Sequence, residues 1–385
     1  MAHPLRGATV IRGVAESELG QVGEDRFALD LLGEAVAGAL DDAGIAKSEV
    51  DGLFTAVTGR MMANLDVGEY LGINPSYTDG TMIGGSSFVS HLHHAAIALQ
   101  AGACNVAVIA YGSTQRTDMR RPNRMPYPPE LPSYEAQARP QHPVTGYALA
   151  ATRHMHEYGT TREQLASVAV AAREWAALNP KAFKRDPLTI EEVLSAREVS
   201  TPFTTLDCCL ITDGGGAVVM TRASDYRDAP KAPAFVLGAG EAHSHRAISQ
   251  MPDLTVTAAR ESGRRAFEMA GLTPSDIDVL QLYDAFTINP ILFLEDLGFC
   301  EKGEGGAFVA DGRIAPGGAL PVNTNGGGLS FCHPGMYGIF TIIEAVRQLR
   351  GEAGARQVAG VRTALAHGNG GQLSSQATAI LGVEA

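Results

Sequence analysis

The sequence has few charged residues, and their balance is negative. Charged side chains make up 19% of the 385 residues, and the formal net charge is −12 at pH 7. Nucleic acids are bound through a basic face, and anionic membrane surfaces attract clusters of lysine and arginine. The composition therefore argues against a nucleic acid or an anionic membrane as a partner of this chain.

Long apolar runs are missing as well. No run approaches the roughly 20 residues that a membrane-spanning helix needs. The first residues, MAHPLRGATVIRGV, lack the charged and then apolar pattern of a signal peptide. We therefore expect a cytoplasmic protein without a membrane segment.

Metal-binding and phosphate-binding motifs are also missing. None of the five cysteines belongs to a CxxC pair, so no zinc site is predicted, and we expect reduced, mostly buried thiols. The segment DGGGAVV lacks the lysine and hydroxyl residue of a phosphate-binding loop. His91 and His94 share a helix face, but no third ligand is indicated, which favours surface or interface histidines over a metal site.

What the chain does contain is an internal repeat. Residues Leu29 to Val57 and Thr255 to Phe286 each read as an amphipathic helix, a glycine stop, an acidic cap and a short apolar strand. Gly44 and Gly271 are the two stops. After each copy, a turn rich in glycine and serine opens a long helix. A chain of two similar halves favours a site where the halves meet, at the turns around residues 84–87, 283–287, 330–338 and 367–371.

The order of elements predicts an α/β fold. Strands are expected over residues 8–14, 50–57 and 105–111, and helices over 26–43 and 86–100. Strand, helix and strand in this order are typical of a parallel sheet with crossover helices. The continuous apolar run NVAVIAY is typical of a strand buried on both faces, and we expect it to pair across a two-fold axis in a homodimer.

The chain is long enough for two domains, and 45% of its residues are hydrophobic. We place the first half at residues 1–228, with an inserted loop region at about 114–205, and the second half at residues 229–385. The insertion begins with a segment rich in proline and arginine, which predicts a loop excursion. Its arginines (Arg116, Arg120, Arg121 and Arg124) favour a solvated surface, with a site for nucleotide phosphates or a partner chain as the alternative.

Four segments of the sequence resemble the sterol-carrier-protein-x type of thiolase. They are the stretch from NPKAFKRDP to DGGGAVVMT, the block LYDAFTINPILFLEDLGFCEKGEGGAFVADG, the block around GLSFCHPGMYG, and the closing HGNGGQLSSQATAILG. The resemblance covers residues 179–381, while the N-terminal half matches in layout. It implies the five-layered αβαβα thiolase fold made of two duplicated halves, which agrees with the repeat read from the residues.

The sequence departs from this family at the nucleophile. Thiolases carry a reactive cysteine at the turn that opens the helix beginning here near Ser86, and this position falls at about Gly85. The local residues are Ile-Gly-Gly-Ser-Ser, and the nearest thiol, Cys104, lies beyond the far end of the helix. A second departure is Tyr283, where the family has asparagine or histidine. A third is Tyr337, within one turn of His333.

Four side chains are therefore the candidate catalytic residues: Tyr283, His333, Tyr337 and His367. His333 precedes Pro334 and opens a helix, whose positive end favours a neutral imidazole. His367 follows an apolar strand and precedes glycines. Tyr283 ends another strand, and a phenol can exchange a proton with an alkoxide when nearby groups stabilise the phenolate. Asp284 either tunes this phenol or caps the following helix.

Without the thiol, a covalent acyl-enzyme is not available, but the means to stabilise a thioester enolate remain. We assign this stabilisation to the backbone at Gly85, Ser86, Gly370 and Gly371 and to the two histidines. Such a site suits retro-aldol cleavage of a β-hydroxyacyl-CoA. No lysine suits a Schiff base, and no metal pattern suits the other class of aldolase. The departures resemble thiolase-like aldolases that shorten steroid side chains.

The resemblance further implies coenzyme A as part of the substrate, no permanently bound cofactor, a homodimer, and a small zinc-ribbon/OB-fold partner protein. Two other functions stay open. One is an acyltransferase that uses Cys332, Ser86 or Ser87 as nucleophile, although a serine needs an adjacent base and more often caps a helix. The other is a non-catalytic subunit that binds a partner or a lipid.

Overall fold

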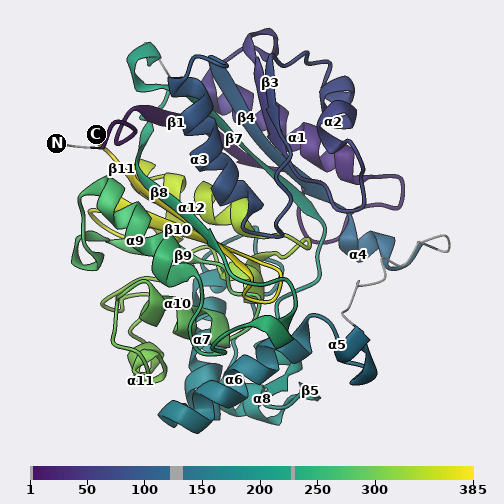
Figure 1. Cartoon of the computed structure of the whole chain (residues 1–385), viewed down its shortest axis with the longest axis vertical. Coiled ribbons are helices and arrows are strands. Elements are labelled where there is room, and N and C mark those ends of the chain that lie inside the picture. Colours follow the sequence, from purple (N-terminus) through teal and green to yellow (C-terminus); the bar gives the residue numbers. More distant parts are fainter. Residues whose placement is uncertain (1–2, 122–132, 227–229) are drawn as a thin grey trace.

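The computed structural model describes residues 3–121, 133–226 and 230–385 (Figure 1). The domain boundary predicted at residue 228 and Arg124 lie outside these ranges. Within them, no helix is both long enough and apolar enough to cross a membrane.

Nine strands form one mixed sheet in the order β3-β2-β4-β7-β1-β8-β11-β10-β9. The first five belong to the N-terminal half: β1 Thr9–Glu16, β2 Gly52–Thr55, β3 Tyr77–Asp79, β4 Val106–Ser113 and β7 Gly214–Arg222. The other four belong to the C-terminal half: β8 Ala234–His243, β9 Val279–Leu282, β10 Thr363–Gly370 and β11 Ser375–Gly382. The halves join through two residue pairs between β1 and β8.

The strand order repeats within the sheet, so the duplication read from the sequence is confirmed. The run β2-β4-β7-β1 in one half matches β9-β10-β11-β8 in the other. In each half the first two strands are parallel and the following pairs are antiparallel. The expectation of a parallel sheet is therefore correct only for β3, β2 and β4 and for β9 and β10, and wrong for the other pairs.

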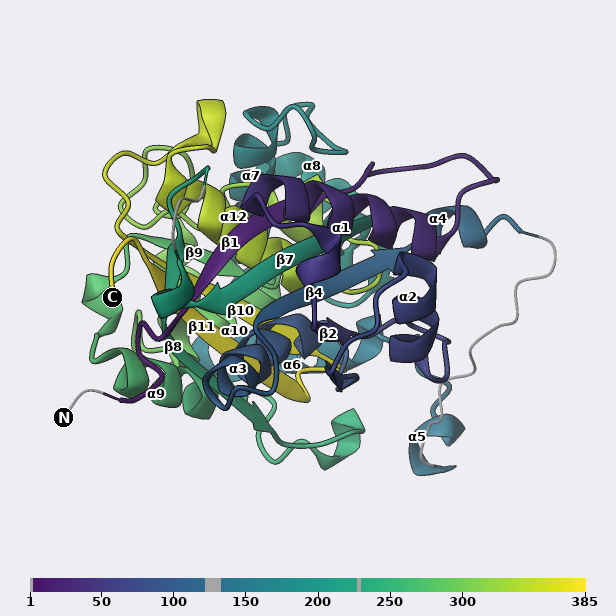
Figure 2. The ribbon, with the colours of Figure 1, turned by 90° about the horizontal axis from the view of Figure 1, so that it is seen from above.

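The helices complete five layers (Figures 1 and 2). Helix α1 (Ala28–Ala43) packs on β1, β4 and β7, and α9 (Ala259–Ala270) packs on β8 and β11. Helices α3 (Ser87–Gln100) and α12 (Gly338–Arg350) contact strands of both halves and form the middle layer. Helix α12 is buried along almost its whole length, as a helix enclosed by two layers must be.

The two repeat helices end alike. Gly44 and Gly271 follow α1 and α9 in the left-handed conformation, each with φ of 64°, and their amides bond back to the last turn. Glycine adopts this conformation without the steric cost that other residues meet. A short 3₁₀ turn and then strand β2 or β9 follow in each half, as the repeat predicts.

The inserted region lies between β4 and β7. It contains α4 (Gln115–Asp118), α5 (Ser133–Gln137), α6 (Val144–Tyr158), α7 (Arg162–Ala177), α8 (Ile190–Ser195), β5 (Glu198–Ser200) and β6 (Phe203–Thr204). Figure 1 shows α6, α7 and α8 gathered at the bottom, near α10 (Ile288–Asp296) and α11 (Gly305–Val309), whereas α4 lies at the right beside the N-terminal half. Helix α2 (Ala63–Leu71) packs on β2. The division into two domains stays a prediction.

The pairing expected for residues 105–111 is wrong. These residues form β4, which is hydrogen-bonded to β2 on one side and to β7 on the other. Both edges of β4 are therefore occupied, and it cannot pair with a second molecule. Its continuous apolar character reflects burial between α1 and α3 instead.

Candidate active site

Turns from both halves meet at the N-termini of α3 and α12. A Cβ atom on Gly85 would lie 2.1 Å from Cε2 of Tyr283, and one on Gly338 would lie 2.1 Å from the carbonyl oxygen of Gly85. A Cβ on Gly370 would lie 1.8 Å from the carbonyl oxygen of Ile83. The turns that the repeat singled out are thus in direct contact, and glycine is needed where backbone meets backbone.

The phenol of Tyr283 fills the space beside the turn that carries the nucleophile in thiolases. Its ring lies against Gly85, and Gly84 (φ +80°) has no room for a side chain either, because a Cβ there would lie 2.8 Å from Cα of Gly370. Neither glycine could be replaced by cysteine without displacing these neighbours. The absence of the thiol is therefore accompanied by a second change, the ring of Tyr283 in the adjoining space.

The hydroxyl of Tyr283 has two partners. It lies 3.0 Å from Nε2 of His333, and it accepts a hydrogen bond of 3.1 Å from the backbone N–H of Tyr337. Burial lowers the pKa of His333 to about 4 and raises the pKa of Tyr283 well above 10. At neutral pH both groups are therefore uncharged, and the phenol donates to Nε2 in the tautomer that carries the imidazole proton on Nδ1.

One hydrogen bond of this hydroxyl favours its ionised form and so opposes the effect of burial. Tyr337 precedes α12, and its N–H is one of the donors that have no partner inside the helix. The positive end of the helix stabilises negative charge at the phenol oxygen. A proton passed from Tyr283 to His333 would leave a phenolate whose charge the N–H of Tyr337 stabilises against the cost of burial.

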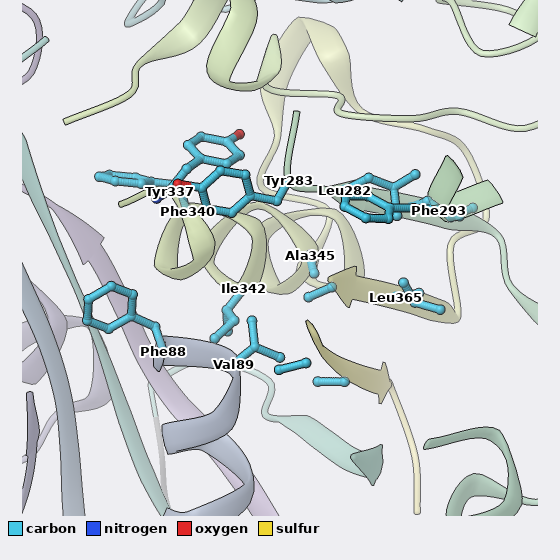
Figure 3. Packing of buried hydrophobic residues seen from close by; sticks show 14 of the residues in the cluster. Phe88, Val89, Leu282, Tyr283, Phe293, Tyr337, Phe340, Ile342, Ala345 and Leu365 are labelled. Carbon is cyan, nitrogen blue, oxygen red and sulfur yellow. Dashed lines mark hydrogen bonds between the residues drawn. The ribbon is translucent and has the colours of Figure 1, made fainter. Parts of the chain in front are cut away.

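Tyr337 contributes its backbone more directly than its hydroxyl. Its ring packs edge-on against the ring of Tyr283, with 5.7 Å between centroids (Figure 3). Its hydroxyl donates to Oδ1 of Asn325 over 2.8 Å. Burial and the carboxylate of Asp284 raise the pKa of Tyr337 well above 10, so this phenol stays protonated.

The backbone of His367 contacts Tyr283, whose N–H donates to the carbonyl oxygen of His367 over 3.1 Å, but the imidazole of His367 lies apart from the other candidates. The residue lies within β10, where its Nδ1 is 2.9 Å from the hydroxyl of Thr378 and its Nε2 is 3.0 Å from Oε1 of Gln376. Its ring packs on Phe293, which Figure 3 shows apart from the two tyrosines. Burial lowers the pKa of His367 to about 3.

The imidazole of His367 points away from the site because side chains alternate between the two faces of a strand. Strand β10 continues through Gly370, whereas the sequence suggested that it ends before His367. Gly368 faces Ser86 of the site, since a Cβ there would lie 3.0 Å from Cα of Ser86. Its neighbour His367 must point to the opposite face. The turn at Gly370 and Gly371 does lie against Gly84, as predicted.

The alternative nucleophiles are poorly placed. Burial raises the pKa of Cys332 well above 9, so its thiol stays protonated. The side chain of Ser86 does not cap α3; its hydroxyl donates to the carbonyl oxygen of Ile83 and lies 2.8 Å from Oγ of Ser375. An imidazole, that of His243, reaches Ser86 only through Ser375.

Several residues that support the site were not found from the sequence. Asn325 accepts from Tyr337, Thr212 accepts the backbone N–H of His333 over 2.9 Å, and the hydroxyl of Tyr111 accepts the N–H of Met336 over 3.2 Å. The glycine run after Asn325 was the one available signal, because it marks a turn that approaches other backbone closely. The other contacts join residues more than 100 positions apart.

A pocket of about 630 Å³ borders the Gly370–Gly371 turn through Gln372, and none of the four candidate catalytic side chains lines it. The inserted region lines one side with residues from α5 and α6, and the loop at residues 248–254 lines another with Ile248, Met251 and Leu254. Gln372, which follows the turn at Gly371, lines the inner end. Tyr147 of α6 donates to the carbonyl oxygen of Gly371 over 2.8 Å and so ties the insertion to this turn.

Two arginines of the insertion, Arg116 and Arg121, bind other groups of the same chain. Arg116 donates to the carbonyl oxygen of Ile211 and to Gln21, and Arg121 pairs with Asp118. These contacts are those of a surface loop, the reading that the sequence favoured. Both guanidinium groups are thus engaged within the chain, which weakens the phosphate-binding alternative for these two arginines.

The histidines of α3 do not form a metal site with the described residues, in which no group of three or more histidine, cysteine or acidic side chains could hold a metal ion. His94 instead bridges two carboxylates, with Nδ1 2.6 Å from Asp79 and Nε2 3.1 Å from Glu241. His91 is buried beside Phe88.

Comparison with known proteins finds relatives that match nearly the whole chain. Residues 240–383 match the family model described as thiolase C-terminal domain-like. The chain is 37% identical to an acetyl-CoA acetyltransferase of Methanothermobacter thermautotrophicus, covering 95% of this chain and 97% of the relative. It is 34% identical to a 17-hydroxy-3-oxo-4-pregnene-20-carboxyl-CoA lyase of Mycobacterium tuberculosis, covering 94% and 96%.

A solved structure described as an Ltp2-ChsH2(DUF35) aldolase has the same fold. It superimposes with a TM-score of 0.88 over 98% of both chains, at 34% sequence identity. Relatives of this similarity span nearly the whole length of the chain. The fold, the duplication and the sequence similarity together show that the chain belongs to the thiolase superfamily.

Proposed function

We propose that the protein is a carbon–carbon lyase that cleaves a β-hydroxyacyl-CoA by a retro-aldol reaction. The products are a ketone or aldehyde and a shortened acyl-CoA. The observation that carries this proposal is the phenol of Tyr283, which lies against Gly85 and is hydrogen-bonded to neutral His333. The lyase among the relatives and the aldolase among the solved structures support it.

The first step removes the proton of the β-hydroxyl group. Tyr283 takes this proton as its own phenol proton passes to Nε2 of His333, 3.0 Å away. The N–H of Tyr337 holds the phenol oxygen while it carries negative charge. General acid–base catalysis of this kind contributes typically about 10²- to 10⁴-fold to a rate.

The bond between the α- and β-carbons then breaks. Its electrons move into the thioester and form an enolate, while the β-carbon becomes a carbonyl group. Backbone groups of the turns at Gly85–Ser86 and Gly370–Gly371 stabilise the enolate oxygen. The proton held by His333 returns through Tyr283 to the α-carbon, so no proton is gained or lost overall.

The adjacent pocket is the route by which we expect the acyl-CoA to enter. Its apolar lining and its inner end at Gln372 suit a long thioester arm that reaches the Gly370–Gly371 turn. Coenzyme A enters as part of the substrate. The steps given above use only described residues of this chain and the substrate.

The main alternative is acyl transfer, since a relative named as an acetyl-CoA acetyltransferase is 37% identical. It requires an acyl-enzyme on a thiol or hydroxyl. Incubation with radiolabelled acyl-CoA, followed by denaturation, tests this function, because acyl transfer leaves label on the protein and the lyase reaction does not. Label on Cys332 or Ser86 would replace our proposal.

Two assembly features belong to the proposal. The solved aldolase is named together with ChsH2, a DUF35 protein, and we propose a small partner of this zinc-ribbon/OB-fold type here. We also propose a homodimer. Strand β3 ends the sheet with one edge unpaired, and Met82, which is 49% exposed, lies close to it in sequence. The cytoplasmic location stays a prediction.

The decisive experiment is product analysis. Incubation with a branched β-hydroxyacyl-CoA, with and without the DUF35-type partner, should give the ketone and the shortened acyl-CoA by mass spectrometry. Tyr283→Phe removes the proton carrier and should lower kcat by about 100-fold or more. Tyr226→Phe, which removes a hydroxyl bonded to the carbonyl oxygen of Lys231, is the matched control and should leave kcat unchanged. Full activity of Tyr283→Phe would refute the assignment.

A further inference from the structure

Asp284 directly follows Tyr283, yet its carboxylate turns away from the helix that begins after it. Helix α10 has Thr287 at its N-terminus and no side-chain cap, so Asp284 does not cap it. The carboxylate is fully buried and instead accepts the backbone N–H groups of Gly328, over 2.6 Å, and of Leu329, over 3.3 Å.

These N–H groups belong to an unusual turn. Residues Gly327–Phe331 form one turn of π-helix, preceded by Gly326 with φ of +103°. Gly327 has φ of +63°, and a Cβ there would lie 2.0 Å from Oδ2 of Asp284. The turn is therefore closed around the carboxylate, and single π-turns of this kind are frequent at functional sites.

Both ends of this turn lead to the catalytic tyrosines. Before it, Oδ1 of Asn325 accepts the N–H of Gly327 over 2.8 Å and also the hydroxyl of Tyr337 over 2.8 Å. After it, the chain passes through Cys332 to His333, whose Nε2 meets Tyr283. One carboxylate thus fixes the segment that holds both hydrogen-bond partners.

We propose that Asp284 is the positioning residue of the site: its carboxylate closes the 326–331 turn and so fixes Asn325 against Tyr337 and His333 against Tyr283. This inference rests on the proposed function where it concerns the rate. The anchoring of the turn can be measured without any substrate.

The charge state of Asp284 gives the proposal a signature. Burial raises the pKa of this carboxyl to about 7, although the N–H groups of Gly328 and Leu329 lower it. No lysine or arginine is among the groups that mainly determine the pKa of Asp284. A carboxylate accepts stronger hydrogen bonds than a carboxylic acid, so the turn should tighten, and kcat should rise, as the pH rises through about 7.

The other titratable groups near Asp284 ionise outside this range. They are His333, with a pKa of about 4, and the thiols of Cys209 and Cys332 and the phenols of Tyr283 and Tyr337, whose pKa values burial raises. A change in rate near pH 7 can therefore be attributed to Asp284.

The test compares Asp284→Asn with Asp296→Asn in the full-length protein with its partner. Asp296 is also buried and accepts a backbone N–H, that of Thr257 over 2.7 Å, but it lies at the end of α10. Asparagine keeps the shape of Asp284 and presents an N–H₂ group to one of the two amides. Hydrogen exchange at Gly328 and Leu329 should become faster in Asp284→Asn and not in Asp296→Asn.

With a substrate that the wild type cleaves, Asp284→Asn should lower kcat by about 10- to 100-fold with little change in KM. It should also remove the rise in kcat near pH 7, whereas Asp296→Asn should keep it. Unchanged exchange at the turn, or a wild-type kcat and pH profile in Asp284→Asn, would overturn the inference. If the wild type cleaves no β-hydroxyacyl-CoA, the proposed function fails, and the exchange result alone decides the role of Asp284.

Discussion

The two halves of the molecule share a scaffold but not a chemistry. Strand β2 and its counterpart β9 occupy equivalent places in the sheet, yet β2 is followed by Ala56 and Val57, whereas β9 is followed by Tyr283 and Asp284. Likewise α3 opens with glycine and serine, whereas α12 opens beside Tyr337.

The difference between the halves assigns them separate tasks. The C-terminal half supplies the phenol, the imidazole and the buried carboxylate. The N-terminal half supplies space, because Gly84 and Gly85 leave room for Tyr283 and for the turn at Gly370. A duplicated fold places the turns of both halves at one point, and only one half then needs to carry the reactive groups.

The largest effect is expected where the space is removed. In Gly85→Ala the new methyl group would lie 2.1 Å from the ring of Tyr283, which is far closer than any real contact. The ring must shift away from His333, so kcat should fall by about 10³-fold or more, and overpacking should cost about 1–3 kcal/mol of unfolding free energy. Product analysis and denaturant unfolding measure the two effects.

Gly33→Ala is the matched control. Its methyl group would also meet a tyrosine ring, that of Tyr70 at 3.0 Å, but Tyr70 is 48% exposed and can move. Gly33 lies within α1, where alanine is the better helix former. The variant should keep full activity and at least wild-type stability. Equal losses in the two variants would contradict the role given to Gly85.

A second contrast is between a buried and an exposed ion pair of the C-terminal half. Arg356 donates two hydrogen bonds of 2.9 Å to the carboxylate of Glu344 in α12. Glu344 in turn accepts the hydroxyl of Thr324, next to Asn325. Arg356→Met should cost about 3–5 kcal/mol of unfolding free energy, because it leaves a buried carboxylate without its partner.

Urea unfolding measures this loss. Arg362→Met removes an exposed ion pair with Glu384, and exposed pairs contribute about 0–1 kcal/mol. A similar small loss in Arg356→Met would mean that the Glu344 network does not support the reactive half.

The scaffold could be predicted from the sequence because its signals are local. Gly44 and Gly271 mark helix ends through their own backbone conformation, and the apolar periods of the neighbouring helices and strands lie within some 30 residues of them. Tyr283, His333 and Tyr337 were found because they replace or match residues of a family motif.

What could not be predicted depends on contacts across the chain. The face on which His367 lies follows from the length of β10, because a strand that runs four residues further than expected places the ring on one defined side of the sheet. The role of Asn325 depends on a hydroxyl twelve positions away in a turn whose π-helical shape has no sequence period. The same holds for β4, whose apolar run does not reveal that both of its edges are occupied.

The smallest predicted effect concerns the bond between the halves. His94 of α3 joins Asp79, which precedes the Gly84 turn, to Glu241 of β8. Hydrogen bonds to these two carboxylates raise the pKa of His94 to about 9. The ion pairs should therefore stabilise the protein fully below pH 6.5, and this contribution should be lost as the pH rises through about 9.

Thermal unfolding between pH 6 and pH 10 tests this prediction. The wild type should lose about 1–3 kcal/mol more than His94→Gln over this range, since glutamine cannot lose a proton. His91 and His93 lie on the same helix, but burial lowers the pKa of both below the usual value, so neither changes its charge near pH 9. Parallel curves for the two proteins would mean that His94 does not hold the halves together. A difference that grows between pH 6.5 and about 9 would support a role of His94 in joining the two halves.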